Sequence, residues 1–176
     1  MARFVLVPER SELWAEARST LHPVRVHTFG LTGEIAAEVG GERILLATPT
    51  QVDFESRRLR SGGALIDREL QRRLDVPRYP SIRAELVTAS PGVEPDSLRL
   101  IGTLGFHGVT RTLDVEVKVR LEDSATLLVE GGRPIDMRDF GLPPPSFLLF
   151  KVDPLVQVRA RLVARKDEAP VRLRAE

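Results

Sequence analysis

Apolar residues recur at every second position through most of this sequence. In residues 113–121 five apolar side chains alternate with charged ones, and residues 98–106 alternate in the same way. Successive side chains of a β-strand point to opposite faces of a sheet, so this period predicts strands with one buried and one solvated face. The pattern therefore predicts a mainly β, antiparallel fold.

Further alternating segments are separated by turn residues; they cover residues 13–18, 24–28, 31–39, 43–54, 82–88, 127–130 and 156–164. Pro49 lacks a backbone N–H, which predicts a bulge or a sheet edge in its strand. Between the strands at 98–106 and 113–121 lies the stretch F-H-G-V-T-R. Gly108 supplies the positive φ that a tight hairpin needs, so we interpret His107 as a turn residue bonded to loop backbone.

One segment departs from the period of two. In A-L-I-D-R-E-L-Q-R-R-L, the apolar residues Ile66, Leu70 and Leu74 are spaced by four. This spacing predicts one short amphipathic helix near residues 64–75. Glycines precede the segment, and Pro77 and Pro80 follow it, as expected for a helix that ends there.

The 176 residues suffice for one domain, expected at residues 1–166 with a flexible C-terminal tail at 167–176. The net charge of +1 does not suggest a nucleic-acid partner. The run Phe4–Val7 ends at Pro8 and is too short for a signal peptide, and no stretch has the ~20 apolar residues of a membrane span. We therefore expect a cytoplasmic location without stable membrane insertion. The oligomeric state stays open, a homodimer included.

Many strands and one short helix predict either a β-sandwich or an antiparallel barrel. An eight-stranded barrel is wide enough to be filled by side chains or to hold one small ligand. Small residues on the inward rows favour the second option. They are Ala15, Ala17, Gly33, Ala37, Ala84, Gly102, Ala160 and Ala164.

Four segments, in this order, resemble the motifs of the YceI-like family. S-T-L-H-P-V resembles its opening Ser-x-x-His segment, and residues 54–86, with R-S-G-G, an Arg-Asp helix and Y-P-S-I, resemble its central signature. G-T-L-G-F-H-G-V-T-R-T-L-D-V-E-V is similar to its hairpin, and R-P-I-D-M-R-D-F-G-L to its Asp-Phe-Gly-Leu motif. The resemblance implies a lipocalin-like antiparallel β-barrel of about eight strands with an apolar tunnel. Relatives in that family bind polyisoprenoid chains, quinone tails or fatty amides.

The residues of catalytic or metal sites are few. His22 and His27 are five positions apart, which places them on opposite faces of a strand, so we expect no metal site. Ser61 in R-S-G-G lacks the remainder of a phosphate-binding loop, and no serine has a convincing base. For Asp67 and Asp139 we expect pairing with a nearby arginine. We accordingly predict no catalytic residues and no cofactor.

Two groups of residues are candidates for ligand contact. Arg68 and Arg72 belong to an arginine cluster around the helix, which we interpret either as head-group contacts for an anionic ligand or as a solvated face paired with Glu55, Glu69 and Asp75. The predicted tunnel lining is Leu13, Ala15, Ile35, Leu86, Leu104, Phe106, Val117, Val158 and Leu162.

The sequence therefore predicts a protein that binds, sequesters or transports a hydrophobic small molecule, an isoprenoid or acyl lipid, without catalysis. An alternative is a protein-interaction module with a closed, dry barrel. A third hypothesis, an enzyme acting on a lipid, requires polar residues inside the tunnel. The alternation offers only Thr28 and Thr88 at inward positions.

Overall fold

A computed structural model of the chain describes residues 1–143, 146–147 and 150–168. Its elements, in chain order, are β1 (Ala2–Leu6), η1 (Pro8–Arg10), β2 (Glu12–Ser19), β3 (Val24–Phe29), β4 (Thr32–Gly40), β5 (Arg43–Glu55), η2 (Ser56–Arg58), α1 (Ala64–Leu74), β6 (Ser81–Pro91), β7 (Ser97–Phe106), β8 (Val109–Asp123), β9 (Thr126–Asp136), η3 (Met137–Phe140), β10 (Ser146–Phe147) and β11 (Phe150–Lys166).

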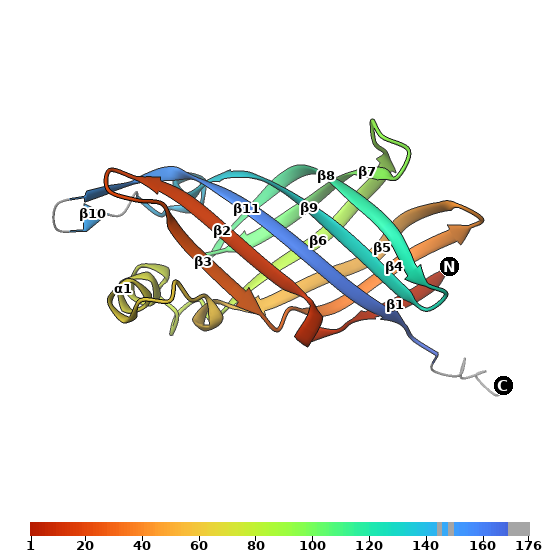
Figure 1. The fold of residues 1–176 in the computed structure, drawn as a ribbon, viewed down its shortest axis with the longest axis horizontal. Helices are drawn as coiled ribbons and strands as arrows, with labels where there is room; N and C mark the ends of the chain where they lie inside the picture. Colours follow the sequence, from red (N-terminus) through yellow and green to blue (C-terminus); the bar gives the residue numbers. More distant parts are fainter. Residues whose placement is uncertain (144–145, 148–149, 169–176) are drawn as a thin grey trace.

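Eight of the strands close into a ring of antiparallel pairs. The ring runs β1, β4, β5, β6, β7, β8, β9, β11 and back to β1, and Figure 1 shows the strands inclined to the long axis of the molecule. The predicted eight-stranded antiparallel barrel is confirmed. The predicted helix is confirmed as α1, which ends where Asp75 takes a left-handed conformation (φ 48°).

The strands β1 and β2 lie in line along β11, with η1 interrupting them. Pro8 begins η1, and the ladder to β11 is kept across the break by Val7, whose N–H donates to the Val163 carbonyl at 2.8 Å. The buried hydroxyl of Ser11 donates to the Val163 carbonyl and accepts from its N–H. Beyond the break, β2 pairs with β3 and widens the wall on that side.

Two register shifts interrupt the ladders, and the second of them changes which residues face inward. The predicted irregularity at Pro49 is confirmed as a register shift between β4 and β5, where Thr50 Oγ1 accepts the N–H of Ala36. A second shift, between Leu86 and Thr88, was not predicted. It places Thr88 on the outer face opposite Ile101, so the expectation of an inward Thr88 is wrong.

The two ends of the barrel differ. The helix end carries α1, η3 and the β2–β3 turn, whereas the β4–β5, β6–β7 and β8–β9 turns, the N-terminus and the end of β11 lie toward the far end (Figure 1). Most of the expected tail at residues 167–176 lies outside the described residues. Asp167 is described, and its N–H donates to the carbonyl of Arg3 at 2.8 Å. No helix in the described part of the chain has the length and apolarity to cross a membrane.

Candidate ligand-binding site

The inner face of the barrel is almost entirely apolar. Residues paired across neighbouring strands share a face, so one inward position fixes the others. Leu104 of β7, for example, lies opposite Ala84 of β6, which in turn lies opposite Val52 of β5. On the other side of the ring, Val158 of β11 lies opposite Ala15 of β2.

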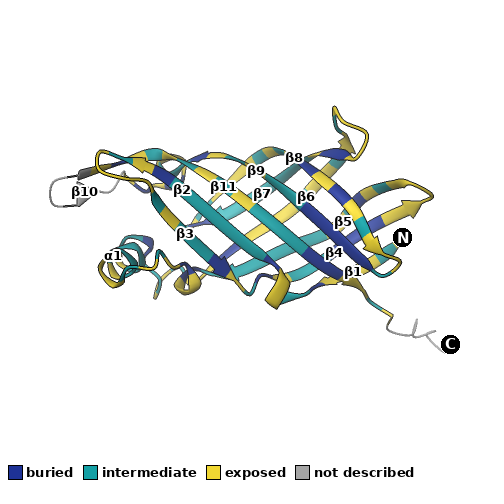
Figure 2. Ribbon diagram, viewed as in Figure 1, coloured by how far each residue is buried: buried dark blue, intermediate teal, exposed yellow. Residues whose placement is uncertain are grey.

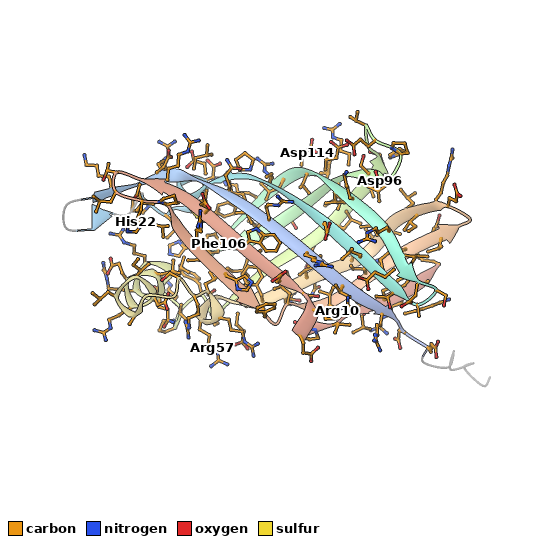
Figure 3. The ribbon with its side chains drawn as sticks, in the orientation of Figure 1. Arg10, His22, Arg57, Asp96, Phe106 and Asp114 are labelled. Atoms are coloured by element: carbon orange, nitrogen blue, oxygen red, sulfur yellow. The ribbon has the colours of Figure 1, made fainter. Side chains whose placement is uncertain are left out.

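Packed clusters of buried side chains lie toward both ends of this inner space. The far-end cluster includes Phe4, Ile35 and Leu127, each at most 1% exposed. The helix-end cluster joins Phe106 and Phe140, whose ring centroids are 5.5 Å apart, to Leu74 of α1. In Figure 3 the Phe106 side chain lies within the outline of the barrel. The helix is therefore held to the barrel by the apolar packing of the end that it covers.

Between these clusters, the inward side chains are only partly buried. Figure 2 shows much of β2 and β11 in the intermediate colour. We call the inward residues of this middle region the lumen wall. Its members are Leu13, Ala15, Val52, Ala84, Leu86, Leu100, Leu104, Val115, Val158 and Leu162. Well-packed protein cores leave few voids, so inward side chains that stay accessible indicate space between the walls.

Ala84 gives the strongest evidence for that space. Its neighbours Arg83 and Glu85 point outward, where the Arg83 guanidinium lies 2.7 Å from the Asp53 carboxylate. Ala84 must then face inward, between Ile82 and Leu86, and yet it is exposed. A small side chain that is both inward and exposed borders open space.

All nine residues predicted as tunnel lining lie on the inner face, but they divide into two groups. Ile35, Phe106 and Val117 are buried in the end clusters. The other six belong to the lumen wall. Their contact with a ligand stays a prediction. Val52 was missed because Thr48 and Thr50 interrupt the apolar pattern of its strand, although the inward positions keep their spacing of two across Pro49.

Two inward positions among the described residues carry a charged side chain. Arg111 lies opposite Leu104, and Arg133 lies opposite Val158. They occur where β8 and β9 separate, since the pairing of these strands ends at Val117 and Gly131. Each guanidinium donates to a backbone carbonyl: Arg111 Nε to Asp139 at 2.9 Å, and Arg133 to Asp114 at 2.9 Å. These hydrogen bonds satisfy backbone carbonyls beside the gap where β8 and β9 no longer pair.

Arg68 and Arg72 lie on the exposed face of α1, away from the lumen wall. The Arg72 guanidinium bonds to Glu69, with Nε to Oε2 at 3.0 Å, and this hydrogen bond holds the pKa of Glu69 below its ordinary value. Glu55 pairs with Arg57 and Arg58 in the same way. The paired, solvated face predicted with Glu55 and Glu69 is therefore present. Contact between Arg68 or Arg72 and a ligand head group stays a prediction.

Asp67 has a different partner from the expected arginine. Its carboxylate accepts the N–H of Ser61 at 2.6 Å and the hydroxyl of Ser61 at 2.7 Å, so it fixes the loop that leads into α1. At Asp139 it is the backbone carbonyl, not the carboxylate, that accepts from Arg111. In the described residues, no group of three or more His, Asp and Glu side chains is arranged to hold a metal ion.

His107 is a turn residue, as predicted, with φ 52° beside Gly108 at φ 74°. Its Nδ1 donates to the carbonyl of Phe140 at 3.1 Å, and its ring lies 4.8 Å from that of Tyr79. The histidine thus joins the β7–β8 hairpin to η3 and to the segment after α1. Its bond reaches η3 instead of its own loop.

Replacing His107 with Asn tests this link. Asn tolerates a positive φ, so the turn should form, but the bond to Phe140 and the contact with Tyr79 would be lost. We expect a loss of about 1 kcal/mol and a melting temperature lower by about 3 °C. Thermal unfolding measures it. His22→Asn, in the exposed β2–β3 turn, is the control; an equal shift in both variants would contradict the assignment.

A closed eight-stranded antiparallel ring around an apolar interior, with a helix packed on one end, defines a small barrel of the lipocalin-like class. The sequence matches the family model of the YceI-like domain over residues 4–164. The protein therefore belongs to the YceI-like family. Comparison with curated proteins finds no match.

Three solved structures have the same fold. BcnA of Burkholderia cenocepacia is 17% identical, with a TM-score of 0.76, and the match covers 90% of this chain and 98% of BcnA. A domain from Saccharophagus degradans, described as polyisoprenoid-binding and implicated in plant cell wall breakdown, is 15% identical, with a TM-score of 0.74 and coverage of 95% and 100%. The Campylobacter jejuni YceI protein is 12% identical, with a TM-score of 0.65 and coverage of 82% and 86%.

Proposed function

We propose that this protein binds a small molecule with a long apolar chain, a polyisoprenoid or a fatty acyl lipid, in the lumen of the barrel. The observation that carries the proposal is the inward, exposed Ala84 within an otherwise apolar wall. The description of the Saccharophagus degradans domain as polyisoprenoid-binding is consistent with it.

Apolar contact is sufficient to hold such a chain. Each buried CH₂ group contributes about 0.8 kcal/mol, so a chain of a dozen carbons gains several kcal/mol even after its loss of freedom. A barrel interior lined by small and aliphatic side chains suits a flexible apolar chain better than a rigid polar metabolite. We therefore infer a carrier or a sequestering protein.

The inner face supports binding over catalysis. The polar inward side chains identified are Thr28, Arg111 and Arg133, and each donates a hydrogen bond to a backbone carbonyl. General acid–base or nucleophilic chemistry needs a reactive group paired with a base near the substrate. None of these three side chains supplies such a pair, so we propose a non-catalytic role.

The test is mass spectrometry of an organic extract of the purified protein, together with native mass spectrometry of the intact complex. We expect one prenyl or acyl lipid per barrel, either retained on purification or taken up from an added prenyl alcohol or fatty acid. A protein that is empty and takes up neither would overturn the carrier proposal and favour the dry interaction module.

A further inference from the structure

Positive charge is concentrated at the helix end. The whole chain has 26 basic and 25 acidic residues, whereas residues 55–80, which form η2, α1 and their flanking loops, have seven arginines and four carboxylates. This segment, which we call the basic segment, is therefore more positive than the molecule as a whole. Its arginines are Arg57, Arg58, Arg60, Arg68, Arg72, Arg73 and Arg78.

The ion pairs of the basic segment leave positive charge over. Arg57 and Arg58 share the single carboxylate of Glu55. In the same way, Arg72 and Arg73 share Glu69. Each of these groups thus keeps a net positive charge.

Three further arginines of the segment form no ion pair with any described residue. Arg60 donates to backbone carbonyls, and Arg78 lies over the ring of Tyr79 at 5.2 Å. Arg68 is exposed on α1.

Five positive charges thus remain in the basic segment after pairing, and the carboxylates of Asp67 and Asp75 offset two of them. The Asp67 carboxylate is already engaged by Ser61.

Exposed leucines accompany this charge. Leu65, in the first turn of α1, is 78% exposed, and Leu21, in the β2–β3 turn, is 67% exposed. Positions 65, 68 and 72 are spaced by three and four, so Leu65, Arg68 and Arg72 share one outward face of the helix. The opposite face packs on the barrel through Leu70 and Leu74. The β2–β3 turn and α1, which carry these two leucines, both lie at the helix end (Figure 1).

The three turns at the far end carry net negative charge. Residues 38–43, 94–96 and 122–124 together contain six carboxylates and one arginine. Lys118 pairs with Glu94 and Arg10 pairs with Glu122, and the turns stay net negative after these two pairs are counted. Figure 3 shows Arg57 beside α1, and Asp96 in the β6–β7 turn away from it. At the helix end, η3 contributes Asp136 and Asp139 as well as Arg138, and the Asp136 carboxylate is neutralised by Arg138 at 2.7 Å.

We propose that the helix end docks on the surface of a bilayer that contains anionic lipids, with Leu65 and Leu21 at the head-group level and the arginines of the basic segment against the lipid phosphates. The charge difference between the two ends would orient the barrel as it approaches such a surface. The far end, with its three acidic turns, would face away from it.

The inference rests on the proposed function, because a carrier of an apolar chain must collect or deliver that chain at a membrane. It gives α1 a second role beside closing the barrel. An arginine near an anionic bilayer contributes about a fivefold gain in partitioning, and an aliphatic side chain at the interface adds to it. Salt screens charges, with a Debye length of about 10 Å at 0.1 M, so it should weaken the electrostatic contribution of the arginines to membrane binding.

The test is co-sedimentation of the whole protein with vesicles of phosphatidylcholine alone and of phosphatidylcholine with about 30% phosphatidylglycerol, a proportion that gives roughly the surface charge for which these gains hold. We expect binding to the anionic vesicles and a clear loss at high salt. The double variant Leu65→Ser/Arg68→Gln should bind at least about tenfold more weakly. Both side chains are exposed, so the variant should fold.

A matched double variant at the far end is the control. Val93→Ser/Arg43→Gln removes a 92% exposed aliphatic side chain and an exposed arginine, the same two kinds of group. It should bind vesicles like the unmodified protein. Equal loss in both double variants, or equal binding to neutral and anionic vesicles, would overturn the proposal. Binding to soluble polyglutamate without vesicle binding would also overturn it, in favour of an acidic protein partner.

Uptake of a prenyl alcohol in solution, measured by native mass spectrometry without vesicles, separates this proposal from the carrier function. The double variant at the helix end should load as the unmodified protein does, since neither side chain lies on the lumen wall and a prenyl alcohol has no anionic head group for Arg68 to contact. Vesicle binding without any uptake would overturn the carrier proposal alone. Uptake without vesicle binding would overturn docking alone.

Discussion

Replacing Ala84 with Phe is expected to abolish uptake of a prenyl or acyl chain while the barrel remains folded. Ala84 faces inward opposite Leu104 and Val52, and its exposure shows that space adjoins it. A phenyl ring there would occupy the lumen that the chain needs. Because the ring would fill existing space, the cost in stability should stay below about 1.5 kcal/mol.

The measurement is native mass spectrometry of the variant mixed with a prenyl alcohol, with thermal unfolding run beside it. We expect at least a hundredfold loss of affinity, since excluding even four CH₂ groups removes about 3 kcal/mol. Thr88→Phe is the matched control. It lies on the same strand beyond the bulge, on the outer face, and should load normally.

Two outcomes would contradict this expectation. If Ala84→Phe loads as well as Thr88→Phe, the chain does not occupy the middle of the barrel. If Ala84→Phe unfolds while Thr88→Phe does not, the space beside Ala84 is already filled, and the dry barrel becomes the better account. The experiment therefore separates the two functions that the sequence left open.

The alternation predicted the barrel well because each strand has one apolar and one polar face. The row from Leu113 to Leu121 is evident in the sequence and lies on one face in the structure. Bulges cannot be recognised in this way, since one extra residue reverses the phase without a change in composition. Pro49 indicated one bulge, whereas nothing in A-E-L-V-T-A-S distinguishes Val87 from its neighbours.

The division of the interior into packed ends and an open middle was also beyond the sequence. Ala37 and Ala84 are both small and inward, yet Ala37 is 0% exposed among large neighbours and Ala84 is exposed. The two alanines differ in the side chains that surround them inside the barrel, and those neighbours are known only once the strand register is known. Arg111 and Arg133 were missed for a related reason. In a sequence, an arginine within an alternating apolar pattern indicates that the strand's inward face has ended.

Gly33→Ala is expected to destabilise the fold far more than the same substitution at Gly40 or Gly41. Gly33 lies opposite Val52 with φ 137°, a backbone conformation that only glycine adopts readily. An added Cβ would be 2.9 Å from the carbonyl carbon of Gln51 and 3.1 Å from the Val52 Cα, closer than ordinary contact. These are backbone atoms of the paired strand, so no side chain can rotate away.

We expect a loss of about 3–4 kcal/mol, of which backbone conformation accounts for about 1–2 and the displaced strand for the rest. The melting temperature should fall by roughly 10 °C. Gly41→Ala isolates the first contribution, because Gly41 also has a positive φ (62°) but open space around it. Gly40→Ala, with neither feature, should change stability by less than about 0.5 kcal/mol.

The three variants together measure how closely β4 approaches β5 beside the bulge. If Gly33→Ala cost no more than Gly41→Ala, the two strands would have room for a methyl group, and the pairing that sets Val52 inward would be wrong. A larger loss of stability in Gly33→Ala than in Gly41→Ala would instead support the register of β4 and β5 described above. Since Val52 lies opposite Ala84 on the next strand, the same result would support the lumen wall on which the proposed function depends.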